Sequence, residues 1–392
     1  MTPVPLNNLA VITMGTAPPG ETYNSDGDGM PMIAGAGDYG DIHPIPKKFT
    51  TSPLAVAEPG DLIICVRATI GDLNWADRQY CLGRGVAGIR PRNGHADIRY
   101  LSHAIESNKT WLASRGTGST FPAIRKADLE EMPVPLPYPH DPKRSLAEQK
   151  RIAAILDKTD AIRRRRHEAA RLTDQLIPSL FYGMFGKWLR MPQTEMARLG
   201  EKELTDIASG VTKGRRFNGQ DTVVVPYIRV ANVQDGYLDL TEIKTIDVLP
   251  QDVEALRLEH GDVLMTEGGD FDKLGRGAIW EHDVPDCIHQ NHVFRVRCNR
   301  RKLMPLFFAN YIRTTGARAY FLRCAKKTSN LASINMTQLR ALPVPRVPID
   351  DQKRFVTKAD EVRKMQRRDK ISMREVDDLF NSLVQRAFRG EL

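Results

Sequence analysis

The amino-acid sequence predicts an α+β protein of two tandem, pseudo-symmetric α/β domains that are separated by two long helices. Three observations predict this fold. A segment of the chain repeats after 203 residues, both copies have the residue spacing of a helix, and short β-rich runs bounded by Gly, Pro, Asn and Asp precede each copy. The predicted order is a domain over residues 1–144, a helix over 145–187, a second domain over 188–347 and a second helix over 348–392.

The repeat carries most of this prediction. Residues 146–185 align without a gap with residues 349–388 and give 12 identities in 40 positions, where chance supplies about two or three. The tripeptide Gln-Lys-Arg stands at 149–151 in the first copy and at 352–354 in the second. The chain therefore contains a duplication, with one domain and one helix in each copy.

The same features precede the helix in each copy. A Gly-Asp turn leads into an apolar run, a polar loop is followed by a short helix-like piece, and a proline-rich exit leads into the long helix. These features lie at 60–67, 118–132 and 132–142 in the first copy and at 261–268, 328–342 and 342–348 in the second. Each domain is therefore predicted to have the same order of elements.

Both repeated segments carry apolar residues at alternating spacings of three and four, which is typical of paired helices. We predict that a coiled coil or a partner protein uses Ile152, Ile155, Ile162, Leu176 and Leu180 in the first helix and Phe355, Val362, Met365, Val376, Leu379 and Leu383 in the second. Arg166, Lys358 and Asp369 interrupt the stripe, so each helix packing only on its own domain stays an alternative. Pro178 should kink the first helix or end it near Ile177.

Composition restricts the class of protein. Lys and Arg outnumber Asp and Glu by 57 to 48, which gives a net charge of +9 spread along the chain. This charge suits a folded surface that meets a polyanion. No apolar run approaches the length of a membrane span, and the N-terminal segment lacks the basic start of a signal peptide. We expect a soluble protein that stays in the cytoplasm.

The cysteine pattern indicates reduced thiols. The five cysteines are odd in number, widely spaced and without a CxxC pair. Cys287, His289, His292 and Cys298 resemble metal ligands in type, but they lie in an alternating run that a strand explains. We therefore predict no metal site.

The sequence offers no catalytic motif. It contains no GxxxxGK[ST] phosphate loop, no glycine-rich cofactor loop after a strand and no Asn-Pro-Pro-Tyr motif of an adenine methyltransferase. Asp239, Glu242 and Lys244 have the residue types of a metal-dependent nuclease, and ordinary strand and turn polarity explains them equally simply. We predict no catalytic residue, with a nuclease and a purely protein-binding coiled-coil adaptor as the alternatives.

Several segments together resemble the specificity subunits of type I restriction-modification systems. They are PLPYPHDPKRSLAEQKRIAAILD at 135–157, SLFYGMFG at 179–186, LVQRAFRGEL at 383–392, GDLIICVRATIG at 60–71, CLGRGVAGIRP at 81–91 and VPYIRVANVQDGYLDL at 225–240. The second copy departs from the usual acidic-Glu-Gln form, because DDQKR stands at 350–354.

The resemblance implies a function and partners. It implies two target-recognition domains that each read half of a bipartite double-stranded DNA site, with conserved helices that pair as an antiparallel coiled coil and dock two modification (methyltransferase) subunits. It further implies that adenine methylation and restriction reside in the modification and restriction/translocase subunits. S-adenosylmethionine, ATP and Mg would then serve those partners and not this chain. We expect some of the arginines at 163–166 to meet a partner protein.

Residue chemistry nominates the DNA contacts. Arg forks onto guanine and Asn or Gln onto adenine, whereas Lys, Ser and Thr mostly hold phosphates. The candidates flank Gly-rich turns or the polar loops. They are Arg67, Arg84, Arg115, Ser119, Thr120 and Lys126 in the first domain, and Lys213, Arg215, Arg216, Arg229, Asn232, Lys273, Arg276, Lys326, Lys327 and Asn330 in the second.

Overall fold

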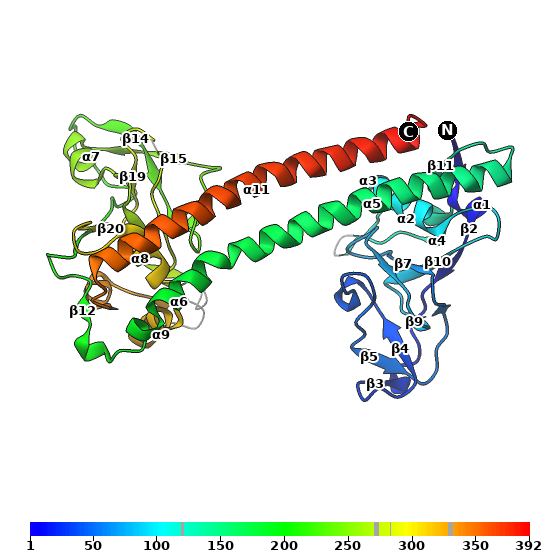
Figure 1. The fold of residues 1–392 in the computed structure, drawn as a ribbon, viewed down its shortest axis with the longest axis horizontal. Helices are drawn as coiled ribbons and strands as arrows, with labels where there is room; N and C mark the ends of the chain where they lie inside the picture. Colours follow the sequence, from blue (N-terminus) through cyan, green and yellow to red (C-terminus); the bar gives the residue numbers. More distant parts are fainter. Residues whose placement is uncertain (119–120, 270–273, 283, 328–331) are drawn as a thin grey trace. The chain divides into compact units, whose positions relative to one another are not determined.

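The structure is a computed structural model that describes residues 1–118, 121–269, 274–282, 284–327 and 332–392. It divides into two compact units (Figure 1). Unit 1 joins residues 1–169 with residues 369–392, and unit 2 comprises residues 170–368. Across the described ranges, no helix is both long and apolar enough to span a membrane.

A four-stranded antiparallel sheet forms the centre of unit 1. Its order is β2 (Ala10–Met14), β10 (Val86–Pro91), β7 (Leu62–Cys65) and β8 (Leu73–Trp75). All four residues of β7 are buried because its continuous apolar run is covered on both faces. The predicted Gly-Asp turn leads into β7, and Gly60 has a φ of 90°, a conformation that favours glycine.

Smaller elements complete unit 1. A second sheet has the order β3 (Tyr23–Asn24), β5 (Lys48–Thr50), β4 (Met30–Ile33), β9 (Tyr80–Leu82) and β6 (Val56–Ala57), and β1 (Thr2–Pro5) pairs with β11 (Pro133–Leu136). The helices are α1 (Leu6–Leu9), α2 (Ile98–Ser107), α3 (Lys109–Ser114) and α4 (Lys126–Glu130), with 3₁₀ turns η1 (Gly20–Thr22) and η2 (Ala36–Asp38). The first proline-rich exit is thus the edge strand β11, where missing N–H donors are tolerated.

Unit 2 repeats the central sheet of unit 1 in the same order. The strands are β13 (Thr205–Ser209), β20 (Val293–Cys298), β16 (Val263–Thr266) and β18 (Gly277–Ile279). A second sheet has the order β15 (Lys244–Val248), β14 (Val223–Ile228) and β19 (Ile288–His289). A third has the order β17 (Gly268–Gly269), β22 (Ala332–Ser333) and β21 (Lys326–Lys327), and β12 (Ala197–Arg198) pairs with β23 (Pro343–Val344).

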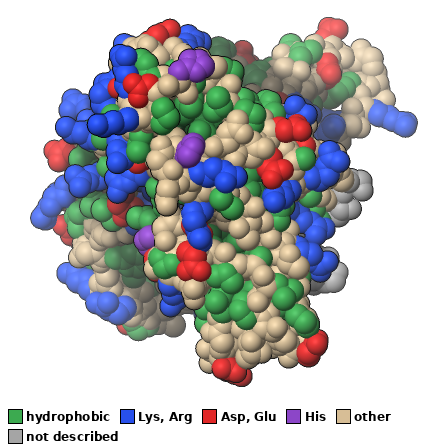
Figure 2. Space-filling model, turned by 90° about the vertical axis from the view of Figure 1, so that its right-hand side faces the viewer, with side chains coloured by type: hydrophobic (Ala, Val, Ile, Leu, Met, Phe, Trp, Pro, Cys, Tyr) green, Lys and Arg blue, Asp and Glu red, His purple; other side chains and the backbone are tan. Residues whose placement is uncertain are grey.

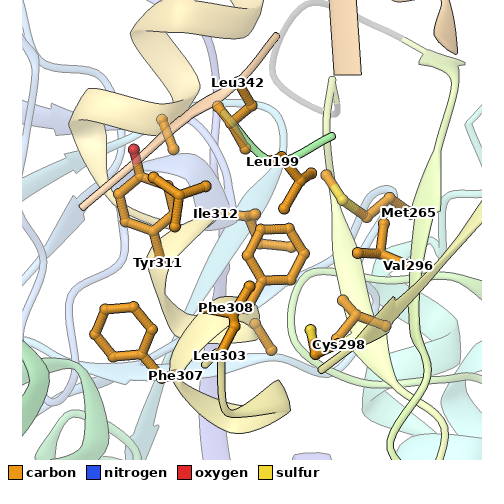
Figure 3. Close-up of a cluster of buried hydrophobic side chains, with 14 of the residues drawn as sticks. Leu199, Met265, Val296, Cys298, Leu303, Phe307, Phe308, Tyr311, Ile312 and Leu342 are labelled. Carbon is orange, nitrogen blue, oxygen red and sulfur yellow. The ribbon is translucent and has the colours of Figure 1, made fainter. Parts of the chain in front are cut away.

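The helices of unit 2 cover this sheet. They are α7 (Pro250–Leu256), α8 (Pro305–Tyr311), α9 (Thr315–Cys324) and α10 (Met336–Arg340), with 3₁₀ turns η3 (Gln193–Glu195) and η4 (Val230–Asn232). Figure 3 shows the core, where Phe308 and Ile312 pack toward Met265 and Val296 of the sheet, whereas Phe307 lies away from them and packs against Phe181 and Phe185. Burial of these large apolar side chains supplies most of the stabilisation of unit 2.

One ion pair recurs at the same place in both central sheets. In unit 1 the Arg90 guanidinium donates to both carboxylate oxygens of Asp61, each at 2.8 Å. In unit 2 Arg297 binds Asp262 in the same bidentate way, again with two distances of 2.8 Å. Each aspartate also accepts a backbone N–H from three residues earlier. The prediction of two pseudo-symmetric α/β domains is therefore confirmed down to an individual contact.

The two long helices are present. The first is α5 (Pro142–Asp174), which a break at Gln175 separates from α6 (Leu176–Leu189), and the second is α11 (Ile349–Arg389). The predicted interruption near Pro178 is confirmed. Pro178 has no N–H to donate to the carbonyl of Asp174, so the helix is broken just before α6.

A buried glutamine fastens the start of each long helix to its unit. In unit 1 the Oε1 atom of Gln149 accepts the Asp97 N–H at 2.9 Å, and its Nε2 donates to the His95 carbonyl at 3.3 Å. Gln149 has no exposed surface. Both partners lie in the segment that enters α2, so this side chain joins α5 to the globular part of unit 1.

Unit 2 repeats the arrangement with Gln352. Its Oε1 accepts the Met304 N–H at 2.9 Å, and its Nε2 donates to the carbonyls of Lys302 at 3.1 Å and Val347 at 2.9 Å. Gln352 is 1% exposed. The shared Gln-Lys-Arg tripeptide therefore has a structural explanation in its glutamine.

Apolar packing of the long helices is concentrated near their ends. In unit 1, Ile152 of α5 and Ala387 of α11 belong to the domain core, and the rings of Tyr100 and Phe388 lie 5.5 Å apart. In unit 2, Phe355 of α11 packs against Phe181 and Phe185 of α6 and contributes to the core. Ile152 and Phe355 are thus domain-core residues. At these two positions the alternative prediction, in which each helix packs on its own domain, is confirmed.

The middle of the helices is polar. In unit 1, Arg163 lies over the ring of Phe380 at 4.5 Å, and His167 pairs with Asp377 at 3.0 Å, so the local pairing is antiparallel. In unit 2, the Gln366 amide donates to the carbonyl of Thr173 at the helix break. The described residues therefore do not form one continuous apolar seam.

The predicted stripe residues differ accordingly in exposure. Ile155, Leu180, Val362, Val376 and Leu383 are half-buried, whereas Ile162, Leu176, Met365 and Leu379 are exposed. The exposed four lie at or near the polar middle of the helices, where neither domain core reaches them. The expectation of a seam is thus corrected for Ile162, Leu176, Met365 and Leu379.

Replacing the glutamine should destabilise its own unit. Gln149→Leu leaves the Asp97 N–H and the His95 carbonyl buried without partners, and each such group costs about 1–3 kcal/mol. We expect the free energy of unfolding of unit 1 to fall by about 3 kcal/mol, measured by urea denaturation of the full chain. Lys150→Ala, an exposed change one residue away, is the matched control. An equal effect of the two substitutions would contradict this explanation.

Candidate nucleic-acid interface

The candidate arginines of unit 1 gather at one end of its central sheet. The Val66 N–H, just after β7, donates to the Gly85 carbonyl at 2.9 Å. This bond places Arg67 beside the turn that joins β9 to β10, which we call the β9–β10 turn (Gly83–Gly85). Arg67 and Arg84 are both exposed, and neither side chain makes a hydrogen bond or ion pair with the described part of the chain. Their guanidinium donors are free for a ligand.

Close backbone packing holds the β9–β10 turn in place. A Cβ atom on Gly85 would lie 2.1 Å from the Ala34 carbonyl oxygen, and one on Gly15 would lie 2.0 Å from that of Gly83. Only glycine fits at such distances. Arg84 is therefore the one side chain of the turn, and it stands on a rigid backbone.

An aromatic and a third arginine lie near Arg67. The Arg67 guanidinium is 6.0 Å from the ring centre of Phe121, an exposed side chain, and Arg67 forms a β-bridge with Ala123. Arg115 stacks on Trp111 at 4.7 Å. The charge of each arginine is retained, because an aromatic face orients a cation without neutralising it.

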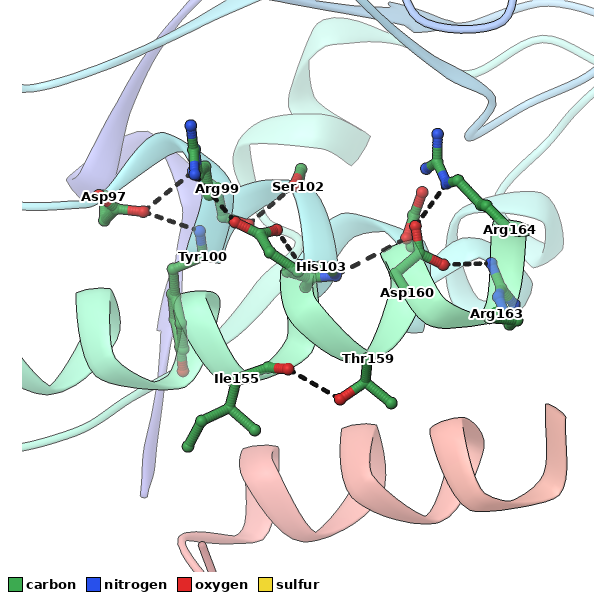
Figure 4. A network of polar contacts seen from close by, with 12 residues as sticks. Asp97, Arg99, Tyr100, Ser102, His103, Ile155, Thr159, Asp160, Arg163 and Arg164 are labelled. Atoms are coloured by element: carbon green, nitrogen blue, oxygen red, sulfur yellow. Dashed lines mark hydrogen bonds and ion pairs between the residues drawn. The ribbon is translucent and has the colours of Figure 1, made fainter. Parts of the chain in front are cut away.

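Other arginines of unit 1 serve its fold. Arg90 is committed to Asp61, and Arg99 and Arg151 pair with Asp157 and Glu148. In Figure 4, Arg163 and Arg164 both bind Asp160, at 2.7 and 2.5 Å. The same view shows Arg99 and His103 of α2 near α5; His103 lies 2.9 Å from Asp157. The arginine run at 163–166 is thus partly used within the chain, where Arg166 also donates to Ser372.

Unit 2 places a different set of side chains on the same frame. The Glu267 N–H donates to the His292 carbonyl at 3.0 Å, as Val66 does to Gly85. The turn that joins β19 to β20, the β19–β20 turn (Gln290–His292), therefore corresponds to the β9–β10 turn. Asn291 corresponds to Arg84, and Gly268 corresponds to Arg67 because both follow the same strand and form the same bridge.

The structure contradicts the prediction for Asn232 and gives Arg229 a partner within the chain. Asn232 is 3% exposed; its Oδ1 accepts the Arg229 N–H at 2.9 Å and its Nδ2 donates to the carbonyls of Asp239 and Glu242. Arg229 binds the Glu242 carboxylate at 3.0 Å. These side chains close a loop after β14, because an amide that satisfies neighbouring backbone groups stabilises a turn. Both N–H groups of the Asn232 amide are used within the loop, so it has no donor left for the paired contact with adenine.

The remaining candidates of unit 2 fall into three groups. Arg215 pairs with Asp252 and Arg276 donates to Gln234. Lys213, Arg216 and Lys326 are exposed and form no ion pair with other described residues. Lys273 and Asn330 lie outside the described residues, as do Ser119 and Thr120 of unit 1, and of Lys327 only the backbone, in β21, is described. In unit 1, Lys126 lies 3.6 Å from Glu130 at the start of α4.

Gln290 and Asn291 were missed by reasoning from sequence. Only the hydrogen bonds between strands show that they occupy the turn equivalent to Gly83–Gly85, because the two turns share no residue type. A carboxamide in a polar run gives no signal of its own. Within the sequence, only the strand pattern around Cys287 and Cys298 indicated that a turn of the sheet lies in this segment.

The possible nuclease triplet makes local contacts. Asp239 accepts the N–H and hydroxyl of Thr241, which lowers the pKa of its carboxyl group. Glu242 binds Arg229 and lies 3.4 Å from Lys244, and these contacts lower its pKa. Among the residues that the structure describes, no group of three or more His, Cys, Asp or Glu side chains could hold a metal ion.

The strand interpretation of the Cys and His residues holds for His289 and Cys298, whereas Cys287 precedes β19 and His292 lies in the turn between the two strands. Cys298 ends β20 and His289 ends β19, where the His289 Nδ1 lies 2.7 Å from the Val293 carbonyl. Burial raises the pKa of the Cys287 thiol to about 12 and lowers that of His289 to about 4. His292 instead pairs with Glu267 at 2.5 Å. The side chains of Cys287, His289, His292 and Cys298 therefore make separate contacts and do not converge on one point.

Two units with one backbone frame and different side chains at its end define the class of this protein: a duplicated two-domain protein. Residues 1–172 match the model of the type I restriction modification DNA specificity domain. The chain is 34% identical over 172 residues to the putative type I restriction enzyme MjaX specificity subunit of Methanocaldococcus jannaschii, and 22% identical over 207 residues to the MjaIX specificity subunit. These matches cover 44% and 48% of this chain but only 40% and 46% of the relatives.

Solved structures extend the likeness to the whole chain. The S subunit of a type I restriction-modification system from M. genitalium covers 99% of this chain and 96% of its own, with a TM-score of 0.55 and 15% identity. A chain from a structure of the type I R-M system covers 100% and 98%, with a TM-score of 0.60 and 18% identity. At these identities the likeness concerns the fold. The sequence matches, which centre on the first half of the chain, and the likeness in fold together make type I specificity subunits the proteins that this chain is similar to.

Proposed function

We propose that this chain is the sequence-specific DNA-binding specificity subunit of a type I restriction-modification complex. Each unit recognises one half of a bipartite site, as a target-recognition domain, and the chain directs adenine methylation and restriction by its partner subunits. The observation that carries this proposal is the recurrence of one frame in both units, with free arginines at its end in unit 1 and free amides in unit 2. Duplicated readers match a duplex with two half-sites.

Electrostatics favours a nucleic acid as the ligand. Free arginines offer forked donors to base edges and phosphates. Figure 2 shows unit 1 from one side, with Lys and Arg side chains crowded along the left margin and few of them on the lower part. A charge of +9 distributed in this way raises the association rate with a polyanion and makes affinity fall with salt.

Partner subunits hold the chemistry in this proposal. S-adenosylmethionine serves the modification subunits, and ATP and Mg serve the restriction/translocase subunits. The exposed apolar residues of the long helices offer a surface to such partners: Ile162 and Leu379 in unit 1, and Leu176 and Met365 in unit 2. Apolar side chains without a cover in the free chain favour docking of another protein.

Modification mapping tests the proposed function. We expect DNA from cells that express this chain with a type I modification subunit to carry methylated adenines in two short half-sites separated by a fixed gap. The purified chain should leave DNA intact in the presence of magnesium, because the alternative of a nuclease requires cleavage. Absence of any split motif, together with absence of salt-sensitive DNA affinity in the assembled complex, would favour the protein adaptor instead.

A charged substitution tests the partner surface. Leu379→Glu places a carboxylate on an exposed position of α11, so the fold should keep its unfolding temperature while the interface loses an apolar contact. We expect co-purification of the modification subunit to fall at least about tenfold. Leu54→Glu in unit 1 is the matched control, since Leu54 is 58% exposed and Leu379 is 56% exposed. Equal co-purification of both variants would exclude this surface.

A further inference from the structure

The corresponding turns of the two units carry different hydrogen-bonding groups. The β9–β10 turn of unit 1 offers the guanidinium of Arg84, and the β19–β20 turn of unit 2 offers the carboxamides of Gln290 and Asn291. The side chains of these three residues make no hydrogen bond with the described part of the chain. Each turn therefore presents free donors, and only the amides also present an acceptor.

The backbone of both turns is held by the same bonds. The Thr16 N–H donates to the Leu82 carbonyl at 2.8 Å, and the Val211 N–H donates to the His289 carbonyl at 2.9 Å. A glycine precedes each donor, and a Cβ on Gly210 would lie 1.8 Å from the His289 carbonyl oxygen, as one on Gly15 would lie 2.0 Å from that of Gly83. The first strand of each central sheet therefore presses against its turn and fixes it.

A second pair of bonds joins the segment that follows β7 or β16, which contacts the turn, to the segment that precedes α4 or α10. The Ile124 N–H donates to the Val66 carbonyl at 2.9 Å, and the Ile334 N–H donates to the Glu267 carbonyl at 2.8 Å. The segment that follows β7 or β16 carries Arg67 in unit 1 and Gly268 in unit 2. Unit 1 thus has a second free guanidinium beside its turn, where unit 2 has no side chain at all.

We propose that these turns are the base-reading elements, and that they give the two half-sites different compositions. Arg84, supported by Arg67, reads guanine in the half-site of unit 1, and Gln290 or Asn291 reads adenine in the half-site of unit 2. This inference rests on the proposed function and specifies its ligand. A fork of two N–H donors matches the O6 and N7 acceptors of guanine, whereas a carboxamide matches the donor and acceptor of adenine.

The rigid backbone of these turns makes them suitable for distinguishing between bases. Discrimination between bases needs a side chain that starts from a fixed backbone, since a loose backbone lets the donors adapt to several bases. Arg78 provides the contrast. It is exposed too, with its guanidinium 5.6 Å from the ring of Tyr80, but it follows β8 at the opposite end of the central sheet. Arg78 has the same charge as Arg84 but does not lie at the β9–β10 turn.

Selection from a random pool tests the inference. The complex of this chain with a modification subunit would be incubated with duplexes that are randomised at every position, and the enriched sequences read. We expect wild type to enrich a split motif with at least one G·C pair in one half and one A·T pair in the other. Arg84→Lys keeps the charge and removes the fork, so discrimination at one G·C position should fall about 10- to 100-fold.

Two further variants assign the halves. A double variant, Gln290→Ala with Asn291→Ala, should relax an A·T position in the half-site that Arg84→Lys leaves unchanged. Arg78→Lys is the matched control and should leave the whole motif unchanged. Arg84→Lys and the double variant should keep the unfolding temperature of wild type, because the replaced side chains make no hydrogen bond with described residues.

The outcomes separate this inference from the function on which it rests. A wild-type complex that enriches no split motif contradicts the proposed function itself. A wild-type split motif that stays unchanged with Arg84→Lys overturns the inference alone. Uniform weakening of all sequences by Arg84→Lys also overturns it, because that result is the mark of a phosphate contact.

Discussion

A buried glutamine at the start of each long helix is the contact on which the arrangement of each unit depends. Gln149 and Gln352 satisfy backbone groups in the segments that enter α2 and α8, and they do so with no exposed surface or almost none. Hydrogen bonds of this kind are directional, and a partner lost in the interior leaves an unpaid desolvation cost. Each long helix is therefore oriented by its domain from its first turns.

The ends of the long helices also pack against the domain cores, whereas the middle of the helices does not. Each domain core takes in the first turns of one long helix and an aromatic-rich stretch near the far end of the other: Phe388 in unit 1, Phe181 and Phe185 in unit 2. Between these ends the described contacts are ion pairs and hydrogen bonds among exposed side chains, which contribute little to stability. Apolar residues in the same stretch are left uncovered, so the segment with the weakest internal packing is also the one that offers a surface to a partner.

Much of the fold was predictable from the sequence because it is duplicated. The repeat predicted two domains and two helices, and Pro178 predicted the interruption of the first helix. The role of Gln149 was out of reach, since its partners lie about fifty residues away in the chain. Asn232 was misassigned because its residue type suits both adenine reading and loop closure, and only its neighbours decide between them.

The candidate interface was predicted unevenly for a related reason. Arg84 stands between two glycines, which signals a tight turn with one outward side chain, and the structure places it there. The equivalent turn of unit 2 has no glycine and no arginine, so Gln290 and Asn291 gave no local signal. The two turns are recognised as equivalent only from the register of the strands that flank them, and this register pairs residues far apart in the chain.

Hydrogen–deuterium exchange along the long helices tests most directly whether they are held by their ends. The account predicts that backbone amides at 149–156 and 352–359 exchange as slowly as those of the central strands, whereas amides at 161–174 and 364–379 exchange faster. Burial in a domain core protects the first group, and helix hydrogen bonds alone protect the second. Uniform slow exchange over the whole length of both helices would contradict the account, because it would indicate one continuous packed seam.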